Sequence, residues 1–241
     1  MSVGVDQIPA RTYARIAGVL YLIIIIGAGF AEGYVRGSLI VPGDPLATAG
    51  NIVASEGLFR FGFVSDLVAF MCDAVVAVLF YFMLRPVSKT LSLIAASLRL
   101  IAHPAIASLN LLNHLSALQV LTNPHFTTTF SGEQIAAIAM QFLAAHRTGY
   151  LVAGAFFGLH CLILGYLIAR SSLFPRLLGL LLIAASFGYL AESFGNFLYA
   201  GNEVILSWIV GISAGVAEIS LCFWLIVKGV RGGSATISIS T

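Results

Sequence analysis

Charged side chains are scarce in this sequence: Asp, Glu, Lys and Arg make up only 9% of its 241 residues, whereas hydrophobic residues make up 59%. Soluble domains carry about 25% charged residues, so the chain lacks the polar surface that a soluble fold needs. The mean hydropathy of +1.00 agrees with this. The net charge of +2 is too small to indicate a nucleic-acid partner. The scarcity of charge therefore excludes a soluble domain and indicates a chain surrounded by lipid.

Cysteine is also scarce, and its three copies, Cys72, Cys161 and Cys222, all lie inside apolar stretches. The sequence has no CxxC spacing and no HExxH pattern of the kind found in zinc hydrolases. It therefore predicts neither a disulfide framework nor a metal site made from neighbouring residues. The cysteines are interpreted as small packing residues.

Long apolar runs are what the sequence has in quantity. A transmembrane helix needs about 20 apolar residues, and such helices are predicted at 13–31, 59–84, 90–115, 146–169, 177–198 and 204–227. An amphipathic helix at 131–144 is predicted from a capping box, Ser131 with Gln134, followed by apolar residues at helical spacing. The predicted fold is all-α: a polytopic membrane bundle of six transmembrane helices plus one extracytoplasmic amphipathic helix. The stretch 33–58 is predicted as a loop, 1–12 as a cytoplasmic N-terminus, and 229–241 as a disordered cytoplasmic tail.

Basic residues are distributed unevenly between the two sides of these spans. The two termini and the turns after the second and fourth spans contain Arg11, Arg15, Arg85, Lys89, Arg170, Arg176, Lys228 and Arg231. The opposite side contains Arg36, Arg60 and Arg147. Because cytoplasmic loops are enriched in Lys and Arg, both termini are predicted to lie in the cytoplasm.

Ionisable side chains occur inside the spans, where each is costly and marks a candidate site. Placed on helical wheels, the polar residues of each span from the second to the sixth share a face, so these faces are predicted to point into the bundle. The candidate ligand-binding residues are Asp66, Asp73, Arg99, His103, His160, Tyr189, Glu192 and Glu218. They predict a polar cavity that opens toward the extracytoplasmic side. His114 and His125 are predicted to be solvated at the outer surface.

Two of these residues are predicted to form an ion pair. Asp73 precedes Arg85 by twelve residues, and Arg99 follows Lys89 by ten. At about 1.5 Å per residue both side chains reach a similar depth on neighbouring antiparallel helices. An Asp73–Arg99 pair near the membrane midplane is the predicted result, and its first interpretation is structural neutralisation of two buried charges.

The central stretch, FFGLHCLILGYLIARSSLFPRLLGLLLIAASFGYL, closely resembles the bacterial DUF4386 family. The residues that carry the match include Gly158-Leu159-His160, Phe174-Pro175-Arg176 and Gly188-Tyr189, and the segment Arg15 to Tyr21 is similar to that family's first span. The resemblance covers 11–229. It implies a multi-pass protein of the bacterial cytoplasmic (inner) membrane and gives weight to His160. Because the family's function is unknown, it implies no activity.

Several functions fit these residues. In the first, the chain binds, transports or senses a small amphiphile or ion, with lipid as its other partner. In the second, His103, His160 and either Asp66 or Glu192 hold zinc for hydrolysis of a lipid-like substrate. In the third, two of His103, His146 and His160 ligate a haem. A scaffold, in which the polar faces serve only helix packing, is the fourth.

Overall fold

A computed structural model describes residues 9–199 and 201–231, and these ranges contain helices and turns but no strand. Six helical segments are long and apolar enough to cross a membrane: Ala10–Leu39, Glu56–Leu84, Lys89–Thr122, Gly132–Arg170, Arg176–Leu198 and Glu203–Val227. Each overlaps one predicted span, so the six-span all-α prediction is confirmed. The predictions for 1–8 and for 232–241 lie outside the described residues.

Two of the six segments contain a π-helix. The first segment consists of α1 (Ala10–Gly29), η1 (Phe30–Arg36) and α2 (Gly37–Leu39). The third consists of α5 (Lys89–Leu100), η2 (Ile101–Ala107) and α6 (Ser108–Thr122). A π-turn inserts one extra residue and redirects the side chains around it, and such turns are frequent at functional sites.

The stretch predicted as a loop over 33–58 is largely helical, so that prediction was wrong. The first span continues through η1 to Leu39, and α3 (Pro45–Ala54) follows a short turn. The continuation is stabilised by burial, because Val35 and Leu39 lie four residues apart and both are buried. Asp44 caps α3 by accepting a hydrogen bond from the Ala47 amide, with Pro45 at the first helical position.

The separate surface helix predicted at 131–144 also needs correction. The predicted capping box is present, but the helix that it starts, α8 (Gly132–Arg170), continues without a break into the fourth span. No proline interrupts the sequence between Ala144 and Arg147, so nothing stops the helix there. Its 39 residues extend about 58 Å, about twice the thickness of the hydrocarbon core.

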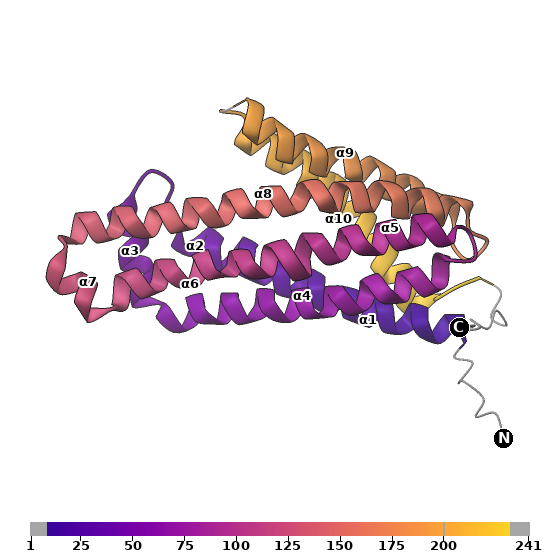
Figure 1. The fold of residues 1–241 in the computed structure, drawn as a ribbon, viewed down its shortest axis with the longest axis horizontal. Helices are drawn as coiled ribbons and strands as arrows, with labels where there is room; N and C mark the ends of the chain where they lie inside the picture. The colour runs from indigo at the N-terminus through magenta and orange to yellow at the C-terminus, as the bar shows by residue number, and fades with distance from the viewer. Residues whose placement is uncertain (1–8, 200, 232–241) are drawn as a thin grey trace, which may run out of the picture.

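The two ends of the bundle contain different helices. Figure 1 shows α8 running the length of the molecule, with α3 and the short helix α7 (Pro124–Thr129) at the end remote from the start of α1. The remaining helices, α4 (Glu56–Leu84), α9 (Arg176–Leu198) and α10 (Glu203–Val227), are shorter than α8. The length of α8 therefore exceeds what one membrane crossing needs, and the excess lies at the end of the bundle where α3 and α7 are found.

Apolar and polar layers alternate along the buried face of α4. Phe59, Asp66, Phe70, Asp73 and Val76 are all buried and follow one another at helical spacing. Phe59 belongs to an apolar cluster at the α3–α7 end, Phe70 to a small central cluster and Val76 to a large cluster at the other end. The two aspartates are therefore enclosed between apolar layers.

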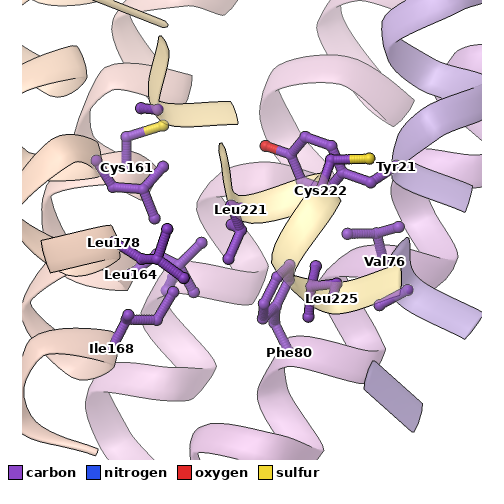
Figure 2. Close-up of a cluster of buried hydrophobic side chains, with 14 of the residues drawn as sticks. Tyr21, Val76, Phe80, Cys161, Leu164, Ile168, Leu178, Leu221, Cys222 and Leu225 are labelled. Carbon is purple, nitrogen blue, oxygen red and sulfur yellow. The ribbon is translucent and has the colours of Figure 1, made fainter. Parts of the chain in front are cut away.

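The large apolar cluster packs α10 against α4 and α8 at the end of the bundle remote from α3 and α7. Figure 2 shows Leu221 and Leu225 of α10 beside Val76 and Phe80 of α4, with Leu164 of α8 across from them. Elsewhere α10 presents exposed apolar side chains such as Ile205 and Trp208. Exposure of this kind along a helix that can span a membrane is what lipid contact requires, and the molecule is a multi-pass membrane protein.

Candidate functional site

The predicted ion pair between Asp73 and Arg99 is confirmed. The Arg99 Nε atom donates to Asp73 Oδ1 at 2.9 Å, and its Nη2 atom donates to the same oxygen. The side chains are 0% and 1% exposed. The short turn between α4 and α5, in which Ser88 caps α5, sets the two helices antiparallel and brings the residues to one level. Each charge neutralises the other where lipid and protein exclude water.

Arg99 is enclosed by aromatic and histidine side chains as well. Its guanidinium carbon lies 4.9 Å from the centroid of the Tyr21 ring and 5.2 Å from that of Phe157, distances typical of cation–π contacts. Its Nη1 atom lies 3.2 Å from His160 Nε2, and His160 Nδ1 lies 2.8 Å from the Ala95 carbonyl oxygen. A carbonyl only accepts, so His160 donates through Nδ1 and accepts from Arg99 through Nε2. Both ring nitrogens of His160 are therefore occupied by the protein.

His103 in η2 completes what we call the central cluster, defined as Asp73, Arg99, His103 and His160. Its Nδ1 atom lies 2.7 Å from Asp73 Oδ2, so one carboxylate joins the arginine and the histidine. Its ring lies between Phe70 and Phe157, with centroids 5.7 and 4.4 Å away. At 14% exposed, the His103 side chain is the most accessible of the four. Within the described chain its Nε2 atom has no hydrogen-bond partner.

Tyr189 and Glu218 form a neighbouring pair that connects α9 with α10. The Tyr189 hydroxyl donates to Glu218 Oε1 at 2.5 Å. The Tyr189 ring meets Phe157 edge-on at 5.0 Å, and Phe157 in turn contacts His103. These two predicted site residues therefore border the central cluster. Glu192 does not join it: its side chain is partly buried and makes no hydrogen bond or ion pair to any described residue.

Asp66 belongs to a second group of polar residues, which we call the outer cluster: Glu32, which is exposed, and the buried residues Arg36, Asp66, Asn110, His114 and His146. Arg36 Nη1 donates to Asp66 Oδ2 at 2.8 Å, and Arg36 Nε donates to Glu32 Oε2 at 2.5 Å. The sequence reasoning placed Arg36 in an extracytoplasmic loop, although it is 5% exposed. The available signal was the helical spacing of Val35 and Leu39 on either side of it.

His114 and His146 lie in the same cluster, so the prediction that His114 is solvated was wrong. His114 is 1% exposed, its ring stacks on Phe59 at 3.8 Å, and its Nε2 atom lies 3.0 Å from the Phe59 carbonyl oxygen. The correction follows from α6 continuing to Thr122, seven residues beyond the predicted end of the third span. His125, in contrast, is exposed as predicted.

The predicted metal ligands are not assembled into a site. Among residues 9–199 and 201–231, no group of three or more His, Cys, Asp or Glu side chains is placed to hold a metal ion. Asp66 is in the outer cluster, His103 and His160 are in the central one, and Glu192 is in neither. Because both nitrogens of His160 are occupied, this residue is also unsuited as an axial haem ligand.

The predicted polar cavity is not seen beside His160. The void that His160 lines offers a volume of about 0 Å³ to a water-sized sphere. A larger hollow of about 580 Å³ lies at the α3–α7 end of the bundle, between α6, α7 and α8, and no predicted site residue lines it. The buried polar side chains therefore pack against one another.

Comparison with known proteins identifies a family whose function is unknown. The model of the family described as "Domain of unknown function (DUF4386)" matches residues 16–229. An uncharacterized protein from the archaeon Archaeoglobus fulgidus is 29% identical over 170 residues, which cover 70% of this chain and 84% of the relative. No solved structure matches. Since the family model covers most of the sequence, the chain belongs to the DUF4386 family.

Proposed function

We propose that this membrane protein binds a small amphiphile or ion at His103, within the central cluster. One observation carries the proposal: His103 is fixed through Nδ1 to a buried carboxylate, while its side chain keeps some exposure and its Nε2 atom has no partner among the described residues. In His160, by contrast, the protein occupies both ring nitrogens. Binding is the step that transport and sensing share.

The chemistry of the ligand follows from the tautomer. Asp73 accepts the hydrogen bond, so His103 carries its proton on Nδ1, and in the neutral ring Nε2 presents a lone pair. A hydroxyl or ammonium group that donates to this lone pair is therefore the expected polar part of the ligand. Phe70 and Phe157, on either side of the ring, suit an apolar part. The Tyr189–Glu218 pair behind Phe157 adds a carboxyl group that favours a cation.

The membrane and the orientation are part of the same proposal. The excess of Lys and Arg at the two ends of the chain and in the α4–α5 and α8–α9 turns supports cytoplasmic termini. The bacterial cytoplasmic membrane remains the proposed location, and the archaeal relative extends the similarity beyond bacteria. Zinc hydrolysis and haem binding are not favoured, because the residues that they require lie in separate clusters or are already hydrogen-bonded.

The test compares what the purified protein retains. Wild type, His103→Asn and His125→Asn are extracted in polymer-bounded native membrane particles, and their small molecules, lipids and metals are measured by mass spectrometry. Asparagine keeps a donor near the Nδ1 position and removes Nε2, so contact with Asp73 persists. We expect a compound or ion near one per protein that wild type and His125→Asn retain and His103→Asn loses. Equal contents in all three proteins would refute the proposal.

A further inference from the structure

Two buried nitrogen atoms in the outer cluster have no hydrogen-bond partner among the residues that the structure describes. They are Arg36 Nη2 and His146 Nε2, on side chains that are each 5% exposed. Leaving a buried polar atom unpaired costs free energy, so such atoms in a folded protein require an explanation. The other nitrogens of both side chains are paired: Arg36 Nε and Nη1 donate to Glu32 and Asp66, and His146 Nδ1 contacts the Asn110 carbonyl oxygen.

The two atoms have opposite hydrogen-bonding roles. Arg36 Nη2 is a donor. His146 Nδ1 lies 3.2 Å from the Asn110 carbonyl oxygen, which only accepts, and 3.3 Å from the Asn110 amide nitrogen, which only donates. Because that amide nitrogen makes its shorter contact elsewhere, we assign the proton of the neutral ring to Nδ1, so that Nε2 is an acceptor. The Asn110 amide nitrogen donates to the His146 carbonyl at 2.6 Å and fixes this arrangement. One donor and one acceptor therefore lack a partner.

Both atoms belong to side chains that flank His114. Arg36 Nη1 lies 3.5 Å from His114 Nδ1, and the His114 and His146 rings meet at a centroid distance of 5.8 Å. His114 itself is paired on both sides, because its Nε2 atom also contacts the Phe59 carbonyl oxygen at 3.0 Å. The four polypeptide segments that supply the cluster, η1, α4, α6 and α8, thus bring an unused donor and an unused acceptor to the two side chains that flank His114.

The charges around Arg36 limit which chemical group can bind to Arg36 and His146. Arg36 already pairs with two carboxylates, Glu32 and Asp66, so a further anion would meet a site with excess negative charge. A hydroxyl group can accept from Arg36 and donate to His146 without carrying charge. We propose that Arg36 and His146 bind the hydroxyl group of a small uncharged molecule, at a site separate from His103.

The position of the cluster suits access from the outer side. Asp66 precedes Arg85 by nineteen residues, which is about 28 Å along α4 and close to the outer boundary of a hydrocarbon core about 30 Å thick. The Glu32 side chain, at 56% exposed, lies at the surface of the cluster. The hydroxyl can therefore come from a water-soluble polyol or from an uncharged lipid headgroup at the membrane surface.

The experiment uses the full chain in nanodiscs of phosphatidylcholine, whose headgroup has no hydroxyl. Glycerol and monoolein are titrated separately, and the midpoint of thermal unfolding is recorded. We expect saturable stabilisation by one of the two probes. Saturation by glycerol identifies a soluble source, and saturation by monoolein alone identifies a lipid. His146→Asn, which keeps the Nδ1 donor and removes the Nε2 acceptor, should raise the half-saturating amount about tenfold, whereas His125→Asn should leave it unchanged.

A second measurement covers the case in which His146→Asn does not fold. Nitrogen NMR of wild type labelled at histidine reports the Nε2 atom directly, and His146→Gln assigns the signal by its loss. We expect the His146 Nε2 signal to shift as the probe saturates. Three results would each overturn the proposal and leave bound water as the partner of both atoms. They are no saturable effect of either probe, an equal effect of the probe on His146→Asn, and a His146 signal that does not shift when the probe is added.

Discussion

At the residue scale, Asp73 is the side chain on which the central cluster depends. Its Oδ1 atom accepts from Arg99 and its Oδ2 atom from His103, so its loss leaves a buried guanidinium without a counter-charge. Removing one partner of a buried ion pair costs about 3–5 kcal/mol, whereas an exposed pair contributes at most about 1 kcal/mol. Burial therefore decides the effect of a substitution more than the distance between the charges does.

Asp73→Asn should strongly lower the midpoint of thermal unfolding in detergent, by the equivalent of about 3–5 kcal/mol. The matched control is Glu56→Gln, which removes the carboxylate of the Arg60–Glu56 pair, whose side chains are 54% and 40% exposed. That variant should unfold close to wild type. Equal shifts for the two variants would show that Asp73 is not enclosed as described.

The proton position on His103 gives a second prediction at this scale. Nitrogen NMR of histidine-labelled protein should show His103 protonated at Nδ1, because Asp73 accepts from that atom at 2.7 Å. The signal is assigned by its absence in His103→Asn. A His103 ring protonated only at Nε2 is incompatible with this hydrogen bond and with the proposed ligand contact.

The sequence predicted the Asp73–Arg99 pair but not the Arg36–Asp66 pair, for a physical reason. A short basic turn joins α4 to α5, so counting residues from it fixes the relative depth of Asp73 and Arg99. Arg36 precedes α4 by a turn and a further helix, so no such count was available. The bridging role of Asp73 toward His103 depends on η2, whose extra residue per turn is not encoded by hydrophobic periodicity.

At the scale of helices, the crossing of α8 and α9 is the closest backbone approach with a clear sequence cause. A Cβ atom added at Gly165 would lie 2.6 Å from the Gly179 carbonyl oxygen and 3.0 Å from the Ile183 amide nitrogen. Backbone atoms cannot move aside as a flexible side chain can, so both glycines are required for the helices to meet. The family resemblance covers this region, and the crossing gives its two glycines a close-packing role.

Gly165→Ala should therefore destabilise the protein by about 1–3 kcal/mol through overpacking. Gly215→Ala in α10 is the matched control, because an added Cβ there has nothing within 4 Å. Alanine is the better helix former by about 1 kcal/mol, so the control should be neutral or stabilising. Thermal unfolding of the two variants checks the prediction, and a Gly165→Ala protein as stable as the control would contradict the described crossing.

At the scale of the whole molecule, helix length distinguishes the helices that match one membrane crossing from the one that exceeds it. The α9 and α10 helices, with 23 and 25 residues, extend about 35–38 Å, which suits one crossing with little excess. The longer α8 exceeds this length, and α3 and α7 lie beside its first turns. Sequence periodicity identified every crossing, but it could not show that α8 continues without a break, because an amphipathic face toward other helices resembles one toward a membrane surface.

Orientation can be measured in intact cells with a membrane-impermeant maleimide. Thr128→Cys lies on the exposed face of α7, and Ser172→Cys lies in the exposed α8–α9 turn. With cytoplasmic termini, Thr128→Cys should be labelled in intact cells and Ser172→Cys only after lysis. The unsubstituted protein gives the background from its native cysteines. The reverse pattern would invert the proposed topology.

The pairing of buried charges within the membrane is tested most directly by comparing Asp73→Leu, Arg99→Met and the double variant in thermal unfolding. Replacing a whole buried ion pair by apolar residues is often neutral, whereas breaking it is costly. We predict that each single variant unfolds well below wild type and that the double variant unfolds at a higher temperature than either. A double variant whose loss equals the sum of the two single losses would contradict the account.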